Sequence, residues 1–421
     1  MSASTVTTVS ASSARRTLLV LTVIRWFPTG LTIGVTALLA IERGMSLAQL
    51  GVILSMQGFV VLGLELPTGG LADAIGRRRV LIVAAVMAFV SALVFVTAHT
   101  FGAFVVALLL QGVFRALDSG PLEAWYVDAA RADDPEAKVE GTLAHAGAAV
   151  GLSIALGALV SGGLVAWHPV SSMTALELPC WVSAAFLLVN VAAIAMRMRE
   201  SRARTVIGGL PRALRSAGEA SRTVVDGLCL LSASTVLRAL VLVEVFWAIA
   251  MIAFETLFPV RLSELAGGTA SAGALMGPVS AAAWGLFAAG SAMAGVVSRR
   301  IGVARTALVA RVLNGALVVV LGLMAGPVGL VTAFLLTYTV HGAAGPMHAT
   351  LLHREAEACN RTTVLSMDSM VGGGAYTVGL LVLGPLAENT STALAIVVAG
   401  AFSILGAALY LPAVRRERRT C

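Results

Sequence analysis

The chain has 421 residues, of which 58% are hydrophobic and 12% are charged, and its mean hydropathy is +0.91. A water-soluble domain of this composition would expose too much apolar surface, so we expect an integral membrane protein. The formal net charge of +7 does not require a nucleic-acid partner, because basic loops on the cytoplasmic side of a membrane produce the same excess.

The N-terminal segment 1–16 is rich in Ser, Thr and Ala and predicts a disordered cytoplasmic tail. Arg15 and Arg16 before an apolar run are also a feature of twin-arginine export signals. However, the span that follows is too long for the apolar region of a signal and carries Arg25. We therefore expect it to be retained as the first membrane helix.

Apolar stretches near the roughly 20 residues that a membrane helix needs recur along the chain. Twelve are predicted, at 17–40, 47–67, 79–98, 101–125, 141–166, 174–196, 238–260, 273–297, 305–325, 328–350, 364–385 and 391–413. The pattern indicates an all-α membrane protein with six spans at 17–196 and six at 238–413. A cytoplasmic linker at 197–237 joins the two halves, and a cytoplasmic tail follows at 414–421.

The basic residues predict the orientation, because cytoplasmic loops retain Lys and Arg. With both termini in the cytoplasm, all but five of the 29 basic residues lie in cytoplasmic segments or at the helix ends beside them. The exceptions are Arg43 and Arg261 on the outer side and Arg25, Arg115 and Arg311 within spans. We expect a multi-pass protein of the inner (plasma) membrane.

The loop between the second and third spans, GGLADAIGRRR, carries a specific motif. Within it Gly69, Asp73, Gly76, Arg77 and Arg78 keep the spacing G-x-x-x-D-x-x-G-R-R. This motif resembles the loop between helices 2 and 3 of the major facilitator superfamily. The resemblance implies a secondary transporter with twelve helices in two bundles and a substrate site near the bilayer midplane between them.

The same resemblance implies a cytoplasmic gate. Asp73 would approach the segment 363–368 at the start of the eleventh helix, and Arg77 or Arg78 would approach Asp128. The chain departs from the family pattern at Ala74, where a basic residue usually follows the acid. A weaker copy of the motif, GVVSRRIGVAR, follows the eighth span and indicates an internal repeat.

Polar residues in the first half give cavity candidates. Arg25, Thr29 and Thr32 lie on one side of the first helix, with Thr22 and Thr36. Such a stripe is typical of a cavity lining that takes part in substrate binding. The alternative is that the threonines bond to their own backbone and Arg25 extends toward the interface.

In the fourth span, Arg115 and Asp118 are three residues apart and can pair within one helix. They form either a structural ion pair or a pair that couples transport to protons. The family often has R-x-x-x-G here, whereas the first glycine after Arg115 is Gly120. This departure weakens the transfer of a role to Arg115.

The seventh span contains two acidic residues within its apolar sequence. Glu244 and Glu255 are eleven residues apart and return to nearly one side of a helix, together with Trp247, Met251 and Phe258. An acid, an aromatic ring and a thioether suit a partly cationic, apolar ligand. We take Glu244 as a candidate for proton coupling and Trp247, Met251 and Glu255 as cavity candidates, with simple helix packing as the alternative.

The tenth span places Thr337, His341 and His348 on one face, and Asp368 lies just inside the eleventh. His341, near mid-span, is a candidate proton relay, with a neutral histidine bonded to a neighbouring helix as the alternative.

No nucleotide-binding glycine loop, H-E-x-x-H zinc motif or paired cysteines occur in the sequence, so we expect no enzyme activity, cofactor, metal or disulfide. The chain resembles the twelve-helix bacterial drug or metabolite:proton antiporters. This implies proton-coupled export of an amphipathic molecule and drug resistance by efflux, with a small-molecule substrate, protons and the lipid bilayer as partners and the monomer as the working form.

The export signature of the fifth helix is only partly present, because Gly147 and Gly151 fit whereas Leu152 replaces a proline. Two alternatives therefore stay open. One is a proton symporter for uptake of a small anionic metabolite, in which Arg25 and Arg115 hold a carboxylate. The other is a membrane receptor or scaffold that does not transport.

Overall fold

The computed structural model describes residues 10–69, 75–134, 136–199, 225, 227–357 and 360–420. These residues form helices and connecting turns, and no strand occurs among them. Twelve helical segments of the described chain are long and apolar enough to cross a membrane, which confirms the predicted number of spans.

The α-helices of the described chain divide equally between its two halves, and the second half also contains two short turns of other helix types. The first half contains α1 (Ala11–Thr32), α2 (Thr36–Glu42), α3 (Leu47–Gly69), α5 (Arg77–Thr97), α6 (Phe101–Leu117), α7 (Pro121–Asp133), α8 (Glu140–Trp167) and α9 (Glu177–Arg197). The second half contains α11 (Thr235–Ile252), the π-helical turn η2 (Ala253–Leu257), α12 (Phe258–Leu265), α13 (Thr269–Ile301), α14 (Val303–Leu323), α15 (Pro327–Glu355), α16 (Arg361–Asn389), α17 (Thr392–Gly406), the 3-10 turn η3 (Ala407–Tyr410) and α18 (Leu411–Thr420).

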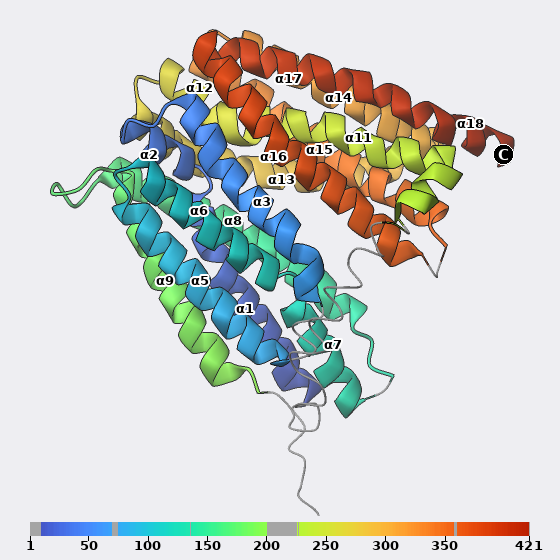
Figure 1. Cartoon of the computed structure of the whole chain (residues 1–421), viewed down its shortest axis with the longest axis horizontal. Helices are drawn as coiled ribbons and strands as arrows, with labels where there is room; N and C mark the ends of the chain where they lie inside the picture. The colour runs from blue at the N-terminus through green and yellow to red at the C-terminus, as the bar shows by residue number, and fades with distance from the viewer. Residues whose placement is uncertain are drawn as a thin grey trace, which may run out of the picture.

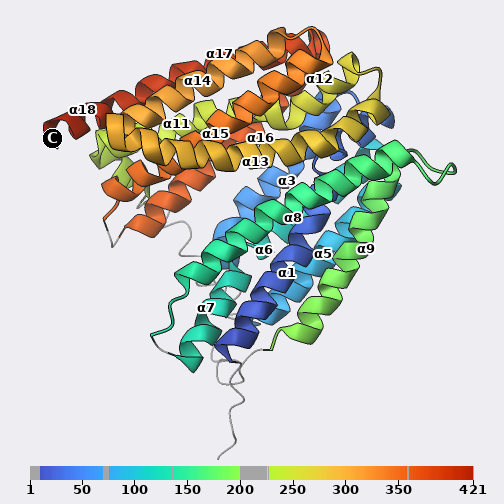
Figure 2. The same ribbon diagram turned by 180° about the vertical axis from the view of Figure 1, so that it is seen from behind.

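The two halves form two bundles that meet at one end and diverge toward the other. Figure 1 shows the first half, blue to green, and the second half, yellow to red, converging near α2 and α12, and Figure 2 shows the same from behind. α7 and α18 lie far from that junction. We call the junction the α2–α12 end and the opposite end, where α1 begins and α18 lies, the terminal end.

The buried core follows the same division. At the α2–α12 end, one apolar cluster contains residues of both halves, such as Leu38, Phe104 and Phe258. Separate clusters fill the first half around Leu18 and the second half around Leu240. The halves therefore share a core at the α2–α12 end, and each also has a core of its own.

Close contacts between the halves depend on glycine. A side chain on Gly162 of α8 would lie 2.7 Å from the carbonyl oxygen of Ala274 in α13, and one on Gly277 of α13 would lie 2.8 Å from Gly162. Gly384 of α16 packs in the same way against the backbone at Leu47 of α3. Because glycine has no side chain, the backbones of these helices come into direct contact where the helices cross.

Four predicted spans are interrupted, among them the twelfth, where the 3-10 turn η3 separates α17 from α18. The first is broken between α1 and α2, and the fourth is broken at 118–120, where Gly120 has a φ of 88° and Pro121 starts α7. In the seventh, Pro259 has no N–H for the carbonyl of Glu255, and the wider turn η2 lies at this point. Each break sits where hydropathy alone predicts a continuous helix.

Candidate functional site

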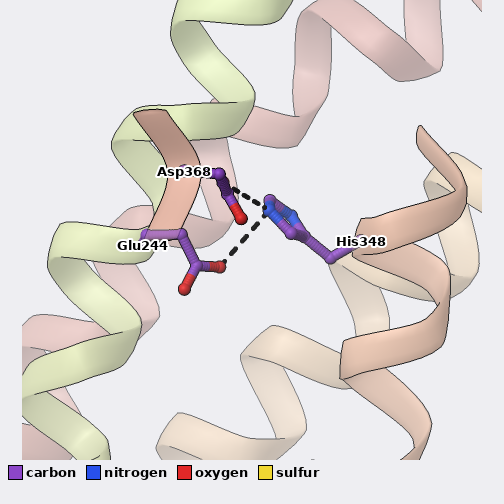
Figure 3. Close-up of side chains that lie close together, drawn as sticks. All are labelled: Glu244, His348 and Asp368. Atoms are coloured by element: carbon purple, nitrogen blue, oxygen red, sulfur yellow. Dashed lines mark hydrogen bonds and ion pairs between the residues drawn. The ribbon is translucent and has the colours of Figure 1, made fainter. Parts of the chain in front are cut away.

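A buried network of ionisable side chains lies inside the second half. It contains Glu244 from α11, Arg311 from α14, His348 from α15, Asp368 from α16 and Tyr410 from η3. Figure 3 shows both carboxylates pointing at the imidazole of His348. Four helices and a helical turn thus bring charged and polar groups to one place in the membrane interior.

The imidazole is the centre of this network. Nε2 of His348 lies 3.3 Å from Oε1 of Glu244 and 3.2 Å from Oδ1 of Asp368, and Nδ1 lies 2.9 Å from the hydroxyl of Tyr410. Arg311 donates from Nη2 to Oε1 of Glu244 at 3.3 Å and from Nε to the Tyr410 hydroxyl at 3.3 Å. Every member except Asp368 is buried, and Asp368 is partly exposed.

The charges of this network balance only when a proton is bound. Two carboxylates and one guanidinium leave an excess negative charge when His348 is neutral, and protonation of the imidazole removes it. Buried charges are costly unless they are compensated, so the two protonation states differ in how well the charges of the network are balanced. The network can therefore change charge without a change of covalent structure.

The local sequence makes room for these contacts. Gly372 lies one turn after Asp368 on α16, and a side chain there would come within 3.2 Å of Oε2 of Glu244. Ligand atoms of Glu244, His348 and Asp368 also lie within 4.8 Å of one another, a spacing that a metal ion can use. Arg311 already supplies positive charge beside Glu244, which favours an ion-pair network over a metal site.

Aromatic rings connect this network to His341. The guanidinium of Arg311 lies 4.1 Å from the ring centroid of Trp247, and Trp247 stacks on His341 at 5.0 Å. Nε1 of Trp247 and Nδ1 of His341 are buried without a hydrogen-bond partner within the described chain. Met251 packs against the apolar cluster shared by the two halves. His341 is therefore surrounded by aromatic rings and lies near the ionic network without belonging to it.

In the first half, the structure pairs Asp118 with Arg25 of α1. The predicted pairing of Asp118 with Arg115 is wrong, because α6 ends at Leu117 and Asp118, as its C-cap, is no longer on a continuing helix. Arg25 also lies over the ring of Trp26, 4.4 Å from its centroid. The ion pair joins α1 to the break between α6 and α7.

The threonines of the predicted stripe differ from one another. Thr29 is exposed, whereas the hydroxyl of Thr32 donates to the carbonyl of Pro28 at 3.2 Å and that of Thr36 to Thr32 at 2.9 Å. Back-bonding of this kind is common for threonine in apolar helices. Trp125 of α7 donates to the carbonyl of Arg199 at 3.1 Å.

Glu244 and Glu255 do not share one environment, contrary to the helical-wheel argument. Glu244 is buried, whereas Glu255 is exposed between buried neighbours in η2. Phe258, expected on the same side, is fully buried and stacks on Phe334 with centroids 3.8 Å apart. Arg115 of α6 is exposed as well.

At the terminal end, the motif residues surround the start of α5. Gly69 ends α3, and Gly76, with a φ of 98°, precedes Arg77 at the first position of α5. Nη1 of Arg77 lies 2.5 Å from Oδ2 of Asp128 on α7, and Arg78 donates to the carbonyl of Ala195 on α9 at 2.7 Å. Asp73 lies outside the described residues.

Sequence reasoning missed the network as a unit. Arg311, His348 and Asp368 each stood out as ionisable residues in or near a span, but Tyr410 did not. The available signal was that four ionisable residues of the second half, including Glu244, belong to four spans. Spacing along one helix does not show that they meet.

Comparisons with known proteins agree with this architecture. A family profile described as Major Facilitator Superfamily matches residues 18–366. A crystal structure of the nucleoside transporter NupG has a TM-score of 0.76 at 13% identity, with 95% of this chain and 98% of that chain covered. A crystal structure of the peptide transporter POT in complex with sulfate has a TM-score of 0.73 at 12% identity, with 95% and 94% covered.

A further crystal structure, a POT family transporter in complex with 5-aminolevulinic acid, has a TM-score of 0.68 at 12% identity, with 94% of this chain and 95% of that chain covered. At these identities the structural matches show the fold alone. No curated protein sequence gives a significant match.

Proposed function

This chain belongs to the major facilitator superfamily, and from that premise we propose that it exports an amphipathic drug-like or metabolite molecule in exchange for protons by alternating access. The protein is a multi-pass membrane transporter and not an enzyme.

The observation that carries proton coupling is the network around His348. Its Nε2 lies within 3.3 Å of the carboxylates of both Glu244 and Asp368. Asp368 is partly exposed and so gives protons a route to the buried members. A bound proton makes this network neutral, and release of the proton leaves it with a net negative charge. The second half can therefore alternate between two charge states. Arg115, Asp118 and His341 are further candidates for this coupling.

The substrate proposal rests on the side chains near the division between the halves. Thr29, Arg115 and Glu255 are exposed, and the aromatic group of Trp247 and His341 lies nearby in the second half. Arg25, Thr32 and Met251 complete the cavity candidates. Apolar and charged groups together suit an amphipathic ligand.

The arginine distribution supports an orientation with both termini in the cytoplasm. The terminal end is then cytoplasmic, and the divergence of the helices in Figure 1 corresponds to an inward-facing arrangement. The gate proposed from the motif, with Gly69, Asp73, Gly76, Arg77, Arg78 and Asp128, would close the terminal end in the opposite arrangement. The protein is proposed to work as a monomer in the inner membrane.

A second candidate is uptake of a small anionic metabolite by proton symport. The observation in its favour is Arg115, an exposed guanidinium within a membrane span. Within the described chain Arg115 has no hydrogen-bond or ion-pair partner, and an arginine of this kind can hold a carboxylate through two parallel hydrogen bonds.

Dye accumulation in cells separates these candidates. We expect cells that express the chain to accumulate less of a lipophilic cationic dye than cells without it, and a protonophore to abolish the difference. Asp73→Asn is the matched control. This variant should be expressed at the membrane but should not reduce dye accumulation. Greater accumulation of an anionic metabolite, also abolished by the protonophore, would replace export by uptake.

A further inference from the structure

Two exposed charged residues belong to opposite halves of the protein, Arg115 to α6 and Glu255 to η2. Neither forms a hydrogen bond or ion pair with another residue of the described chain. A charge without a partner is costly within a membrane span, so it normally faces water or a ligand. These two side chains are thus available to a molecule between the halves.

The two charges lie at similar depth in the membrane. Gly112, one turn before Arg115, packs against Gln57 and Val60 of α3, because a side chain on it would come within 2.8 Å of the carbonyl of Gln57. Gly58, the next residue of α3, packs against Thr377 of α16. The level of Arg115 is therefore close to the level of Thr377.

Thr377 and Glu255 also lie at similar depth in the membrane. Tyr376, the preceding residue of α16, shares a hydrogen bond of 3.1 Å between its hydroxyl and that of Thr256, the residue after Glu255. The charge of Arg115 also acts electrostatically on Glu255 and Tyr376. Arg115 of the first half and Glu255 of the second therefore lie at similar depth in opposite halves, and no hydrogen bond or ion pair joins them within the described chain.

We propose that Arg115 and Glu255 bind the two ends of an amphipathic zwitterion, an organic molecule whose anionic group meets Arg115 and whose cationic group meets Glu255. The inference rests on the proposed function, because it needs an organic substrate between the halves. A simple cation would leave Arg115 unpaired, and a simple anion would leave Glu255 unpaired. A zwitterion that spans both would also draw the halves together, as closure around a substrate requires.

One aromatic residue close to Glu255 can meet the apolar part of such a molecule, because Tyr376 is partly exposed next to Thr256. Phe254, the residue before Glu255, is buried and supports this region from behind, against the rings of Tyr338 and His341 with centroids 5.6 and 5.2 Å away. Aromatic faces hold flat apolar groups and also attract cations. The cationic end of the ligand should therefore carry or adjoin an aromatic ring.

Three dyes with one shared skeleton test the proposal. Rhodamine 110 is a zwitterion, its methyl ester rhodamine 123 is a cation, and fluorescein is an anion. Binding to the purified full-length protein in detergent is measured by fluorescence polarisation. We expect rhodamine 110 to bind about tenfold more tightly than either of the other two, because only it can satisfy both charges.

Neutral variants assign each end of the dye. Glu255→Gln should weaken rhodamine 110 and rhodamine 123 by about tenfold and leave fluorescein unchanged, whereas Arg115→Gln should weaken rhodamine 110 and fluorescein and leave rhodamine 123 unchanged. Arg79→Gln, at an exposed arginine of α5, is the control that should change none. Because each variant keeps its affinity for one dye, misfolding cannot produce this pattern.

Absent binding of rhodamine 110, equal affinities for the three dyes, or variant effects that ignore dye charge would overturn the zwitterion proposal. The measurement needs no proton gradient, so its outcome is separate from that of the proposed function. Gradient-driven dye export without charge selectivity would leave proton-coupled export intact and remove this inference alone. Selective binding without gradient-driven transport would do the reverse.

Discussion

Arg311 donates to Glu244 across 3.3 Å, and both side chains are buried inside the second half of the protein. In a medium of low dielectric constant this pair is held by mutual attraction, and either partner alone would be costly. His348 and Asp368 add one proton-binding group and one further carboxylate at the same place. The pair is therefore part of a network whose total charge depends on one proton.

We predict that Glu244→Gln uncouples transport from the proton gradient. The amide keeps the shape of the side chain but removes a negative charge, so the network no longer needs a proton for balance. In proteoliposomes, gradient-driven dye transport should fall by about tenfold or more, which corresponds to roughly 1.4 kcal/mol. Exchange of labelled for unlabelled dye without a gradient should persist.

Glu264→Gln is a suitable control, because Glu264 lies in α12 and contacts Arg261 and Thr392, away from the network. This variant should keep gradient-driven transport within about twofold of the unmodified protein, since it leaves the network intact. Full gradient-driven transport by Glu244→Gln would contradict a role for this carboxylate in coupling.

A second prediction concerns Arg25 and Asp118, which join α1 to the break after α6. Asp118 is 5% exposed and Arg25 20% exposed, so removal of one partner leaves a charge in a poorly hydrated place. We expect Arg25→Gln to destabilise the protein by about 3 kcal/mol and the double variant with Asp118→Asn to cost less than the sum of the two single variants. Thermal unfolding in detergent measures the coupling. Strictly additive effects would mean that the pair contributes nothing.

The number of spans could be predicted because the hydropathy of each stretch is a local property. The breaks were missed, although Gly120 followed by Pro121 is a strong local signal, because the surrounding run is uniformly apolar. The pairing of Asp118 with Arg25 could not be predicted from the sequence, because the two residues belong to different helices. Spacing along the sequence shows only which residues share a face of one helix.

The same limit applies to the buried network. Arg311, His348 and Tyr410 come from separate elements of the second half. The contact between Arg77 and Asp128, by contrast, is present as the family motif implied. A motif carries information about distant contacts that composition and periodicity do not contain.

A third prediction tests Arg77 as a gate residue. Its partner Asp128 is 41% exposed, so the ion pair should add less than about 1 kcal/mol to stability. Arg77→Ala should therefore leave unfolding nearly unchanged but slow transport by about tenfold, because the ion pair with Asp128 positions the start of α5 for closure of the terminal end. Arg79→Ala, two positions along the same helix and exposed, should stay within about twofold. Equal effects of the two substitutions would show that transport depends on the positive charge at this end and not on Arg77 in particular.

The last prediction uses adjacent glycines of α8 to test the contact between the halves. A side chain on Gly162 would meet the backbone of α13 at Ala274 and Gly277, whereas one on Gly163 would meet nothing within 4 Å. Gly162→Val should therefore force α8 and α13 apart and cost about 1–3 kcal/mol, while Gly163→Val should cost far less. Thermal unfolding of both variants in the same detergent gives the comparison. Because this contact must break whenever the α2–α12 end opens, Gly162→Val should also favour the arrangement open at that end, which spin-label distances between α8 and α13 would report as a longer separation. Similar stability and similar distances in the two variants would mean that the halves are not held by this glycine crossing.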